Sequence, residues 1–230
     1  MAGHTSTLLE DYFIGKTVFL TGGTGVLGGC LLYKLTVELQ VRKVFVLIRS
    51  KIKAESAWRN SLSDNINRIF DSGKIELVLG DITLPSFGIS KDELDKISQE
   101  TEIVINSAAD ISLGAKLAST ISKNCLPPLE LARMASKFSK LTCFVQISTA
   151  YVNCHLPDGR VEERIYPLGC AKEDLEQALL TGTTKSATKF LKPYTYAKHM
   201  MEELLTQYHP MLPLLIVWTL FSSLHEILVD

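Results

Sequence analysis

Six short runs rich in Val, Ile, Leu and Phe recur along the 230-residue chain, and they constrain its fold more than any other feature. Each run is almost continuously apolar rather than alternating, which is typical of parallel strands covered on both faces. The predicted strands are residues 17–21, 43–48, 75–80, 102–107, 143–148 and 214–219. Helical periodicity lies between them, over residues 26–39, 58–70, 129–138 and 172–180. This alternation predicts an α/β fold with a doubly wound parallel sheet, the Rossmann fold.

The segment TVFLTGGTGVLGG places glycines directly after the first predicted strand and at the start of a predicted helix. Their spacing is that of a dinucleotide-binding loop, where glycines permit a tight turn, close approach of a pyrophosphate and close helix–strand packing. The helix N-terminus adds unpaired N–H groups and the positive end of its dipole. A plain strand-to-helix turn is the alternative interpretation. The predicted cofactor-binding residues in this segment are Thr21, Gly22, Gly25, Val26, Leu27 and Gly28.

The end of the second predicted strand indicates which dinucleotide would bind. A site for NAD carries an acidic residue there, which holds the ribose 2′-hydroxyl. Here Arg49 and Lys51 follow the strand, and the first acidic residue is Glu55. Arg49 can pair with a 2′-phosphate, so the sequence favours NADPH, unless these charges are only solvated. After the third strand, Asp81 and Ile82 offer a carboxylate and an apolar side chain beside an adenine ring.

Reaction chemistry beside a nicotinamide needs a proton donor, and the pair Tyr194 and Lys198 is the candidate. Four residues apart on a helix, the two side chains share one face, and a nearby ammonium group lowers the pKa of a phenol. Ser148 and Thr149 end the fifth predicted strand, at the sheet edge where ligands bind, and could hold a carbonyl oxygen. The same spacing begins at Tyr12, but that pair precedes the first strand. An interfacial tyrosine with a snorkelling lysine is the structural alternative.

Composition excludes several other classes of protein. The net charge of −1 and the pI near 6.5 argue against a nucleic-acid partner. Five scattered cysteines without a CxxC pair indicate an intracellular, reducing compartment, and neither they nor the histidines have metal-ligand spacing. The N-terminus lacks the apolar core of a signal peptide, and the apolar C-terminal stretch is too interrupted to predict a membrane span.

Five segments occur in one order and at suitable spacing: DYFIGKTVFLTGGTGVLGG, LIRS, GDIT, ISTAYVN and YTYAKHMMEELL. Together they resemble the extended short-chain dehydrogenase/reductase superfamily, specifically the NAD-binding portion of fatty acyl-CoA reductases of the male-sterility type. The resemblance covers about Asp11 to Val217. It implies that NADPH reduces an acyl-CoA through an aldehyde to a primary alcohol. It also implies that Tyr194 is the general acid, that Lys198 binds the nicotinamide ribose, and that Thr149, with Ser148 as the alternative, holds the substrate oxygen.

The chain departs from this family pattern near the predicted site. Asn124 is followed by Pro127 and Pro128, where the family commonly has Asn-x-x-Gly-Thr. Trp218 and Thr219 stand at the end of the sixth strand, in the place where the family commonly has Arg-Pro. The first departure alters the start of a helix beside the predicted site.

We predict a single NADP-binding domain over residues 1–230, in which residues 155–193 form an insertion outside the sheet on the substrate side. Because family members continue further, we expect an incomplete substrate lobe and impaired reduction of long acyl chains. Residues 220–230 are predicted to form one short amphipathic segment.

Two other interpretations stay open: a non-catalytic NADP(H)-binding relic or regulatory subunit, and a thioester reductase or nucleotide-sugar enzyme of the same fold. By the resemblance, the protein is cytosolic or lies at a peroxisomal or endoplasmic-reticulum membrane. Peripheral membrane contact stays open. The sequence does not specify the oligomeric state.

Overall fold

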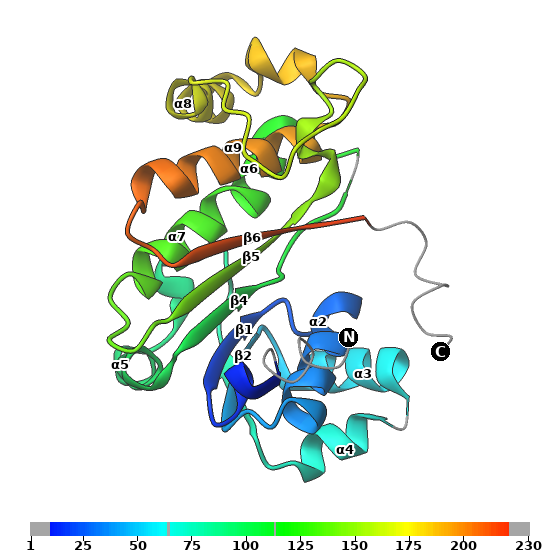
Figure 1. Cartoon of the computed structure of the whole chain (residues 1–230), viewed down its shortest axis with the longest axis vertical. Coiled ribbons are helices and arrows are strands. Elements are labelled where there is room, and N and C mark those ends of the chain that lie inside the picture. The colour runs from blue at the N-terminus through cyan, green and yellow to red at the C-terminus, as the bar shows by residue number, and fades with distance from the viewer. Residues whose placement is uncertain (1–9, 64, 113, 221–230) are drawn as a thin grey trace, which may run out of the picture. The chain divides into compact units, whose positions relative to one another are not determined.

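The computed structural model describes residues 10–63, 65–112 and 114–220. Within these ranges six strands form one sheet with the order β3-β2-β1-β4-β5-β6 (Figure 1). The strands are β1 (Thr17–Thr21), β2 (Lys43–Ile48), β3 (Ile75–Leu79), β4 (Ile103–Asn106), β5 (Cys143–Thr149) and β6 (Leu214–Thr219). Strand β1 pairs in parallel with β2 and with β4, and β2 pairs in parallel with β3. The predicted parallel α/β fold is therefore confirmed.

Helices connect the strands, as the alternation of patterns predicts. The α-helices that lie wholly within the described residues are α2 (Val26–Tyr33), α3 (Lys51–Leu62), α4 (Asn65–Asp71), α5 (Lys91–Glu100), α6 (Leu117–Asn124), α7 (Leu126–Ala135), α8 (Ala171–Thr181) and α9 (Pro193–Tyr208). The same part of the chain also contains the shorter helical turns η1 (Lys34–Glu38), η2 (Pro85–Gly88), η3 (Ala150–Asn153) and η4 (Ser186–Lys189).

Three helix predictions need correction. The helix predicted over 26–39 ends at Tyr33 and continues as the π-helical turn η1. The helix predicted over 58–70 is two helices, because Ser63 adopts the left-handed conformation (φ 47°), which a right-handed helix cannot continue. The helix predicted over 129–138 is α7, which starts earlier because prolines in the first turn leave no N–H unpaired.

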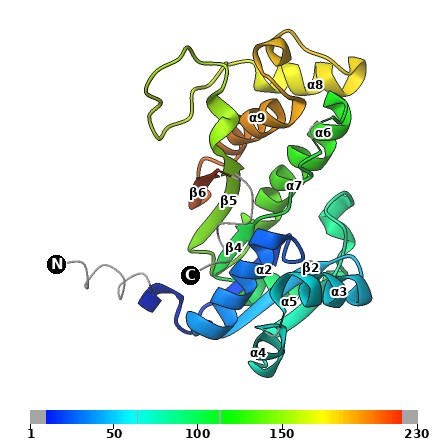
Figure 2. The same ribbon diagram turned by 90° about the vertical axis from the view of Figure 1, so that its right-hand side faces the viewer.

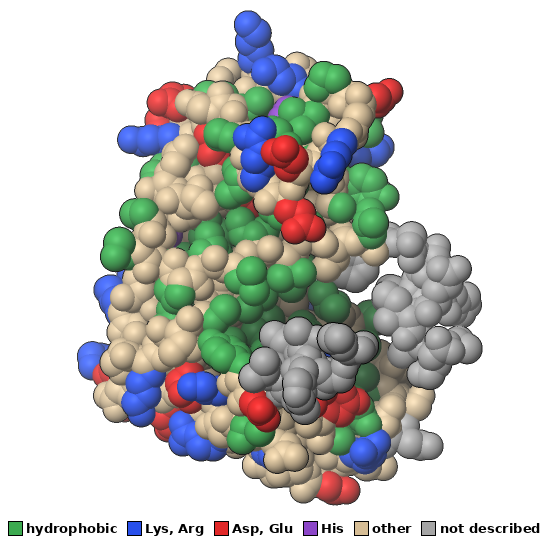
Figure 3. All heavy atoms as spheres, viewed as in Figure 1, with side chains coloured by type: hydrophobic (Ala, Val, Ile, Leu, Met, Phe, Trp, Pro, Cys, Tyr) green, Lys and Arg blue, Asp and Glu red, His purple; other side chains and the backbone are tan. Residues whose placement is uncertain are grey.

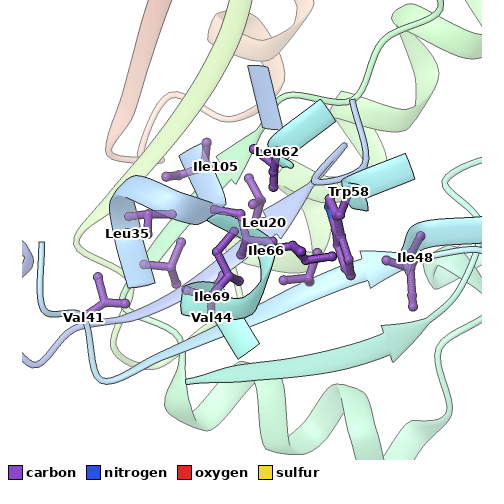
Figure 4. Packing of buried hydrophobic residues seen from close by; sticks show 14 of the residues in the cluster. Leu20, Leu35, Val41, Val44, Ile48, Trp58, Leu62, Ile66, Ile69 and Ile105 are labelled. Carbon is purple, nitrogen blue, oxygen red and sulfur yellow. The ribbon is translucent and has the colours of Figure 1, made fainter. Parts of the chain in front are cut away.

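The apolar strands β1 and β2 pack against helices α2, α3 and α4 (Figure 4). Trp58, Leu62, Ile66 and Ile69 converge on this core, and Trp58 is only 1% exposed. The leucine and isoleucine spacing that predicts one long helix therefore identifies the correct buried face. The chain changes direction at Ser63, and the apolar side chains of α3 and α4 on either side of it are both buried in this core.

Contacts within the chain divide it into two compact units. The first unit comprises Met1–Ala109, Glu130–Val145 and Met211–Leu215, and the second comprises Asp110–Leu129, Gln146–Pro210 and Ile216–Asp230. In the second unit, α6, α8 and α9 pack together (Figure 2). A single domain over residues 1–230 stays a prediction.

Residues 155–193 contain no strand, as the sequence predicts, and hold α8 and η4. Their position beside a substrate stays a prediction. The amphipathic segment predicted over 220–230 lies, apart from Leu220, outside the described residues. None of the described helices is long and apolar enough to cross a membrane. Acidic and basic side chains are interspersed over the face drawn in Figure 3.

Candidate active site

The loop after β1 is shaped by glycines that other residues could not replace. Gly22 adopts φ 72°, in the left-handed region that favours glycine. A Cβ at this position would lie 2.5 Å from the backbone nitrogen of Ala108, which follows β4. The loops after β1 and β4 thus approach each other closely, at the point where the strand order reverses direction from β1. Dinucleotides bind at this switch point in doubly wound sheets.

Helix α2 begins directly behind this loop. Gly25 is its N-cap and donates its N–H to Gly22 O at 3.0 Å. A Cβ on Gly28 would lie 2.7 Å from Gly22 C and 2.8 Å from Gly23 Cα, so the helix packs on the loop backbone. Val26 is exposed and Leu27 is half-buried in the first turn of the helix. The N-cap has no side chain to bind the first N–H groups, so these groups can bind an anion.

Two further hydrogen bonds fix this loop, and sequence analysis finds neither. The buried indole of Trp58 on α3 donates from Nε1 to Gly23 O at 2.7 Å. Thr21 Oγ1, at the end of β1, donates to Asn106 Oδ1 at the end of β4. A buried indole N–H needs an acceptor, but the position of Trp58 in the sequence does not predict which residue provides it.

Arg49 and Asp81 lie at the ends of neighbouring strands. Arg49 follows β2 and is exposed, and Asp81 comes after β3. Gly80 N donates to Ile48 O at 3.0 Å, which holds the two strand ends together. The pKa of Asp81 is lowered, first by hydrogen bonds from the N–H and hydroxyl of Thr83 and then by the Arg49 guanidinium. Arg49 is therefore close enough to Asp81 for its positive charge to favour the ionised carboxylate.

The residue Ile82 is half-buried directly after Asp81. Along the sheet, β1, β2 and β3 are neighbours, so all the predicted residues of the first unit follow the carboxyl ends of adjacent strands. This is the edge where ligands bind in doubly wound sheets. The first unit thus brings together the residues predicted to bind a dinucleotide: Thr21, Gly22, Gly25, Val26, Leu27, Gly28, Arg49, Asp81 and Ile82.

In the second unit, Ser148 and Thr149 end strand β5 with different hydrogen-bond roles. The Ser148 hydroxyl donates to Glu202 Oε1 on α9. Thr149 is the N-cap of η3, and its Oγ1 accepts from Tyr151 N at 3.3 Å. A hydroxyl that accepts still has its own proton to donate. Thr149 is therefore better placed than Ser148 to donate to a substrate oxygen.

Helix α9 carries Tyr194 in its first turn and Lys198 one turn later. It starts at Pro193, which has no N–H that would need a partner there. Burial raises the pKa of Tyr194, which is opposite to the predicted direction. The predicted effect fails because Lys198 Nζ donates to Ile147 O of β5 at 2.9 Å, and desolvation of the phenol dominates.

Lys198 is almost fully buried, with 2% of its surface exposed. Desolvation lowers its pKa to about 8, while the charge of Glu202 raises it and so limits the drop. An ammonium group has three N–H donors, of which the bond to Ile147 O uses one. The remaining two can bind hydroxyl groups of a ligand.

Glu202 is a site residue that sequence analysis misses. It is 1% exposed and accepts from Ser148 Oγ and from Trp218 Nε1, the latter at 2.9 Å. Burial raises its pKa to about 7, against the lowering effects of these donors and of Lys198. Its position four residues after Lys198 was a signal in the sequence, since the two then share one helix face.

Comparison with known proteins shows a family match over most of this chain. Residues 20–218 match an NAD-binding family described as male sterility protein. The chain is 28% identical over 224 residues to the protein named fatty acyl-CoA reductase wat of Drosophila melanogaster, covering 90% of this chain and 43% of that protein. It is 28% identical over 222 residues to human fatty acyl-CoA reductase 2, covering 86% of this chain and 42% of that protein. The chain thus spans less than half the length of these curated relatives.

Among solved structures, the terminal R domain from the myxalamid PKS-NRPS biosynthetic pathway is similar, with a TM-score of 0.67 and 24% sequence identity. The similarity covers 89% of this chain and 48% of that one. At this level of sequence identity, the structural similarity shows a shared fold and nothing beyond it.

Proposed function

Because this chain belongs to the male sterility protein family, we propose that it is a reductase of fatty acyl thioesters that uses NADPH. The family match carries the proposal, since residues 20–218 include every residue of the candidate site. Relatives over this region are fatty acyl-CoA reductases, and the fold is that of NAD-binding reductases. An acyl-CoA is accordingly the proposed substrate.

The glycine loop supports a nicotinamide dinucleotide as the cofactor. A Cβ at Gly22 or Gly28 would overlap backbone atoms, so the loop backbone packs closely against its neighbours. A pyrophosphate would bind there, at the N-terminus of the helix. When bound, NADPH supplies a hydride. The exposed Arg49 would hold a 2′-phosphate, and Asp81 and Ile82 would border the adenine.

The second unit supplies the groups that act on the substrate. The Thr149 hydroxyl would donate to the carbonyl oxygen, because the Ser148 hydroxyl is bonded to Glu202. The Tyr194 phenol would give its proton to the oxygen as negative charge develops there. A pKa raised by burial keeps the phenol protonated and ready to donate. Lys198 would bind ribose hydroxyls through its two remaining N–H groups.

Titration of the protein with NADPH and with NADH tests the cofactor assignment. A charge-assisted bond to the 2′-phosphate contributes about 1.5–3 kcal/mol, so NADPH should bind roughly 10–150-fold more tightly. Arg49→Ala should remove most of this preference, and Lys51→Ala, which removes a nearby positive charge at the first position of α3, is the matched control. Equal affinities for the two cofactors in the unmodified protein would overturn the NADPH assignment.

Oxidation of NADPH with acyl-CoAs of increasing chain length tests the activity, and analysis of the products distinguishes aldehyde from alcohol. Each buried CH₂ contributes about 0.8 kcal/mol to substrate binding, so the dependence of turnover on chain length measures how much of the acyl group this chain buries. Tight NADPH binding without turnover of any acyl-CoA would favour a non-catalytic binding protein instead. Turnover that rises steadily with chain length would show that this chain already encloses the acyl group.

A further inference from the structure

A buried carboxylate lies beside the lysine of the candidate site without a direct part in the proposed chemistry. Glu202 is 1% exposed and is held by donors from two strands, Ser148 Oγ of β5 and Trp218 Nε1 of β6. Thr219 Oγ1 also donates to Ser148 O at 3.0 Å, which fixes the two strand ends to each other. The carboxylate therefore has a single, well-defined position on the sheet side of α9.

Glu202 follows Lys198 by one helical turn, so both side chains lie on the same face of α9. Lys198 is bonded through Nζ to Ile147 O, a neutral acceptor that cannot compensate its positive charge. A buried ammonium group without a counter-charge loses its proton readily. In this site, the negative charge of Glu202 raises the pKa of Lys198 against desolvation.

Two charged side chains on the helices packed against α9 are paired with other residues. On α6, Lys123 pairs with Asp110 at 2.6 Å, and on α8, Asp174 accepts from Tyr196 OH at 2.5 Å. Cys125, between α6 and α7, is fully buried, and desolvation raises its pKa to about 12. The turn η3 carries no charged side chain. His155, which follows it, packs on His199 of α9 with ring centroids 4.8 Å apart, and burial lowers its pKa.

The neighbouring titratable residues on α9 itself are Tyr194, Tyr196, His199 and Glu203. Burial raises the pKa of Tyr194 and lowers the pKa of His199 to about 4, so both are neutral at pH 7. Glu203 accepts from the backbone N–H groups of Leu168 and Gly169, at 3.1 and 3.0 Å. Glu202 is thus the carboxylate whose charge acts on Lys198.

We propose that Glu202 is a positioning residue for cofactor binding, whose charge keeps Lys198 protonated within its buried site. The inference rests on the proposed function, in which Lys198 binds the ribose of NADPH. It predicts that the charge of Glu202, rather than its hydrogen bonds, sets the alkaline limit of NADPH binding.

Glu202→Gln separates these two contributions, because the amide oxygen still accepts from Ser148 and Trp218 while the charge is gone. Losing a neighbouring opposite charge should lower the pH of Lys198 deprotonation by about one unit. NADPH affinity should then match the unmodified protein near pH 6 and be roughly fivefold weaker at pH 8. Glu203→Gln is the matched control, since it neutralises an equally buried carboxylate on the same helix. It should leave the pH profile unchanged.

NADPH titrations between pH 6 and 9 provide the first readout. A uniform loss of affinity at all pH values in Glu202→Gln would indicate a structural role and overturn the inference. So would an unchanged profile. The second readout needs no cofactor: the ¹³Cε resonance of Lys198 is followed in lysine-labelled protein and assigned with Lys198→Met.

The midpoint of that resonance should lie near pH 8 in the unmodified chain and lower in Glu202→Gln. If Glu202→Gln does not fold, Trp218→Phe serves instead, because it removes one donor to the carboxylate and should shift the midpoint less, in the same direction. An unchanged midpoint in the variant that folds overturns the inference. Failure of the unmodified chain to bind NADPH overturns the proposed function, and the Lys198 midpoint still decides whether Glu202 holds its charge.

Discussion

Replacing Gly28 with alanine is the substitution whose cost the structure defines best. The new methyl carbon would lie 2.7 Å from Gly22 C and 2.8 Å from Gly23 Cα, and closer still to Gly22 O. Carbon atoms in contact prefer about 3.5–4.0 Å, and the overlapped atoms are backbone that cannot rotate away. Helix α2 and the glycine loop must therefore separate.

Overpacking of this kind costs about 1–3 kcal/mol, which exceeds or cancels the gain of roughly 1 kcal/mol that alanine gives in a helix. We expect Gly28→Ala to lower the melting temperature by about 2–4 °C for each kcal/mol of net loss. A displaced loop also misaligns the N–H groups that would bind the pyrophosphate. Losing one such charge-assisted bond should weaken NADPH binding roughly 10–150-fold.

Gly29→Ala is the matched control, one residue further along the same helix. Its Cβ would meet only the Leu62 side chain, at 3.6 Å, which is ordinary van der Waals contact. Because this variant gains helix propensity without overlap, it should stabilise the protein by about 1 kcal/mol. Thermal unfolding of both variants measures the two changes in stability, which should have opposite signs. NADPH titration then measures the change in affinity. A Gly28→Ala protein that is as stable as the unmodified chain and binds NADPH equally well would refute the reasoning.

Three further predictions follow from individual side chains. Tyr194→Phe should lower turnover by about 10²–10⁴-fold with little effect on NADPH affinity, as steady-state kinetics would show, whereas retained turnover would assign the proton donor elsewhere. Trp58→Phe leaves Gly23 O without its indole donor and should cost about 1–3 kcal/mol in urea unfolding, and equal stability would contradict this role. Desolvation, and then His155, lower the pKa of His199 from 6.5 to about 4, so below pH 6.5 the unfolded chain binds a proton that the native protein does not. Stability should therefore fall by about 3 kcal/mol between pH 6.5 and 4, and His199→Phe should lack that component in urea titrations, whereas parallel profiles would exclude it.

The strands and the glycine loop could be predicted from the sequence because their signals are local. The continuous apolar runs place all six strands to within one residue at each end. The spacing of Gly22, Gly25 and Gly28 predicts a tight turn and close helix packing, and the backbone conformation and Cβ overlaps at Gly22 and Gly28 agree. These features depend on residues that are neighbours in the chain, so their types and spacing are sufficient.

Hydrogen-bond partners and desolvation were decided only by the tertiary structure. Ser148 and Glu202 are 54 residues apart, and Trp58 and Gly23 are 35 apart, so no periodicity links them. The helix spacing of Tyr194 and Lys198 is right, yet the direction of the tyrosine pKa is wrong, because the phenol is buried while the ammonium bonds to a strand carbonyl. A sequence specifies which side chains share a face of a helix or strand. The charge state and the partner of each side chain depend on what the fold packs against that face.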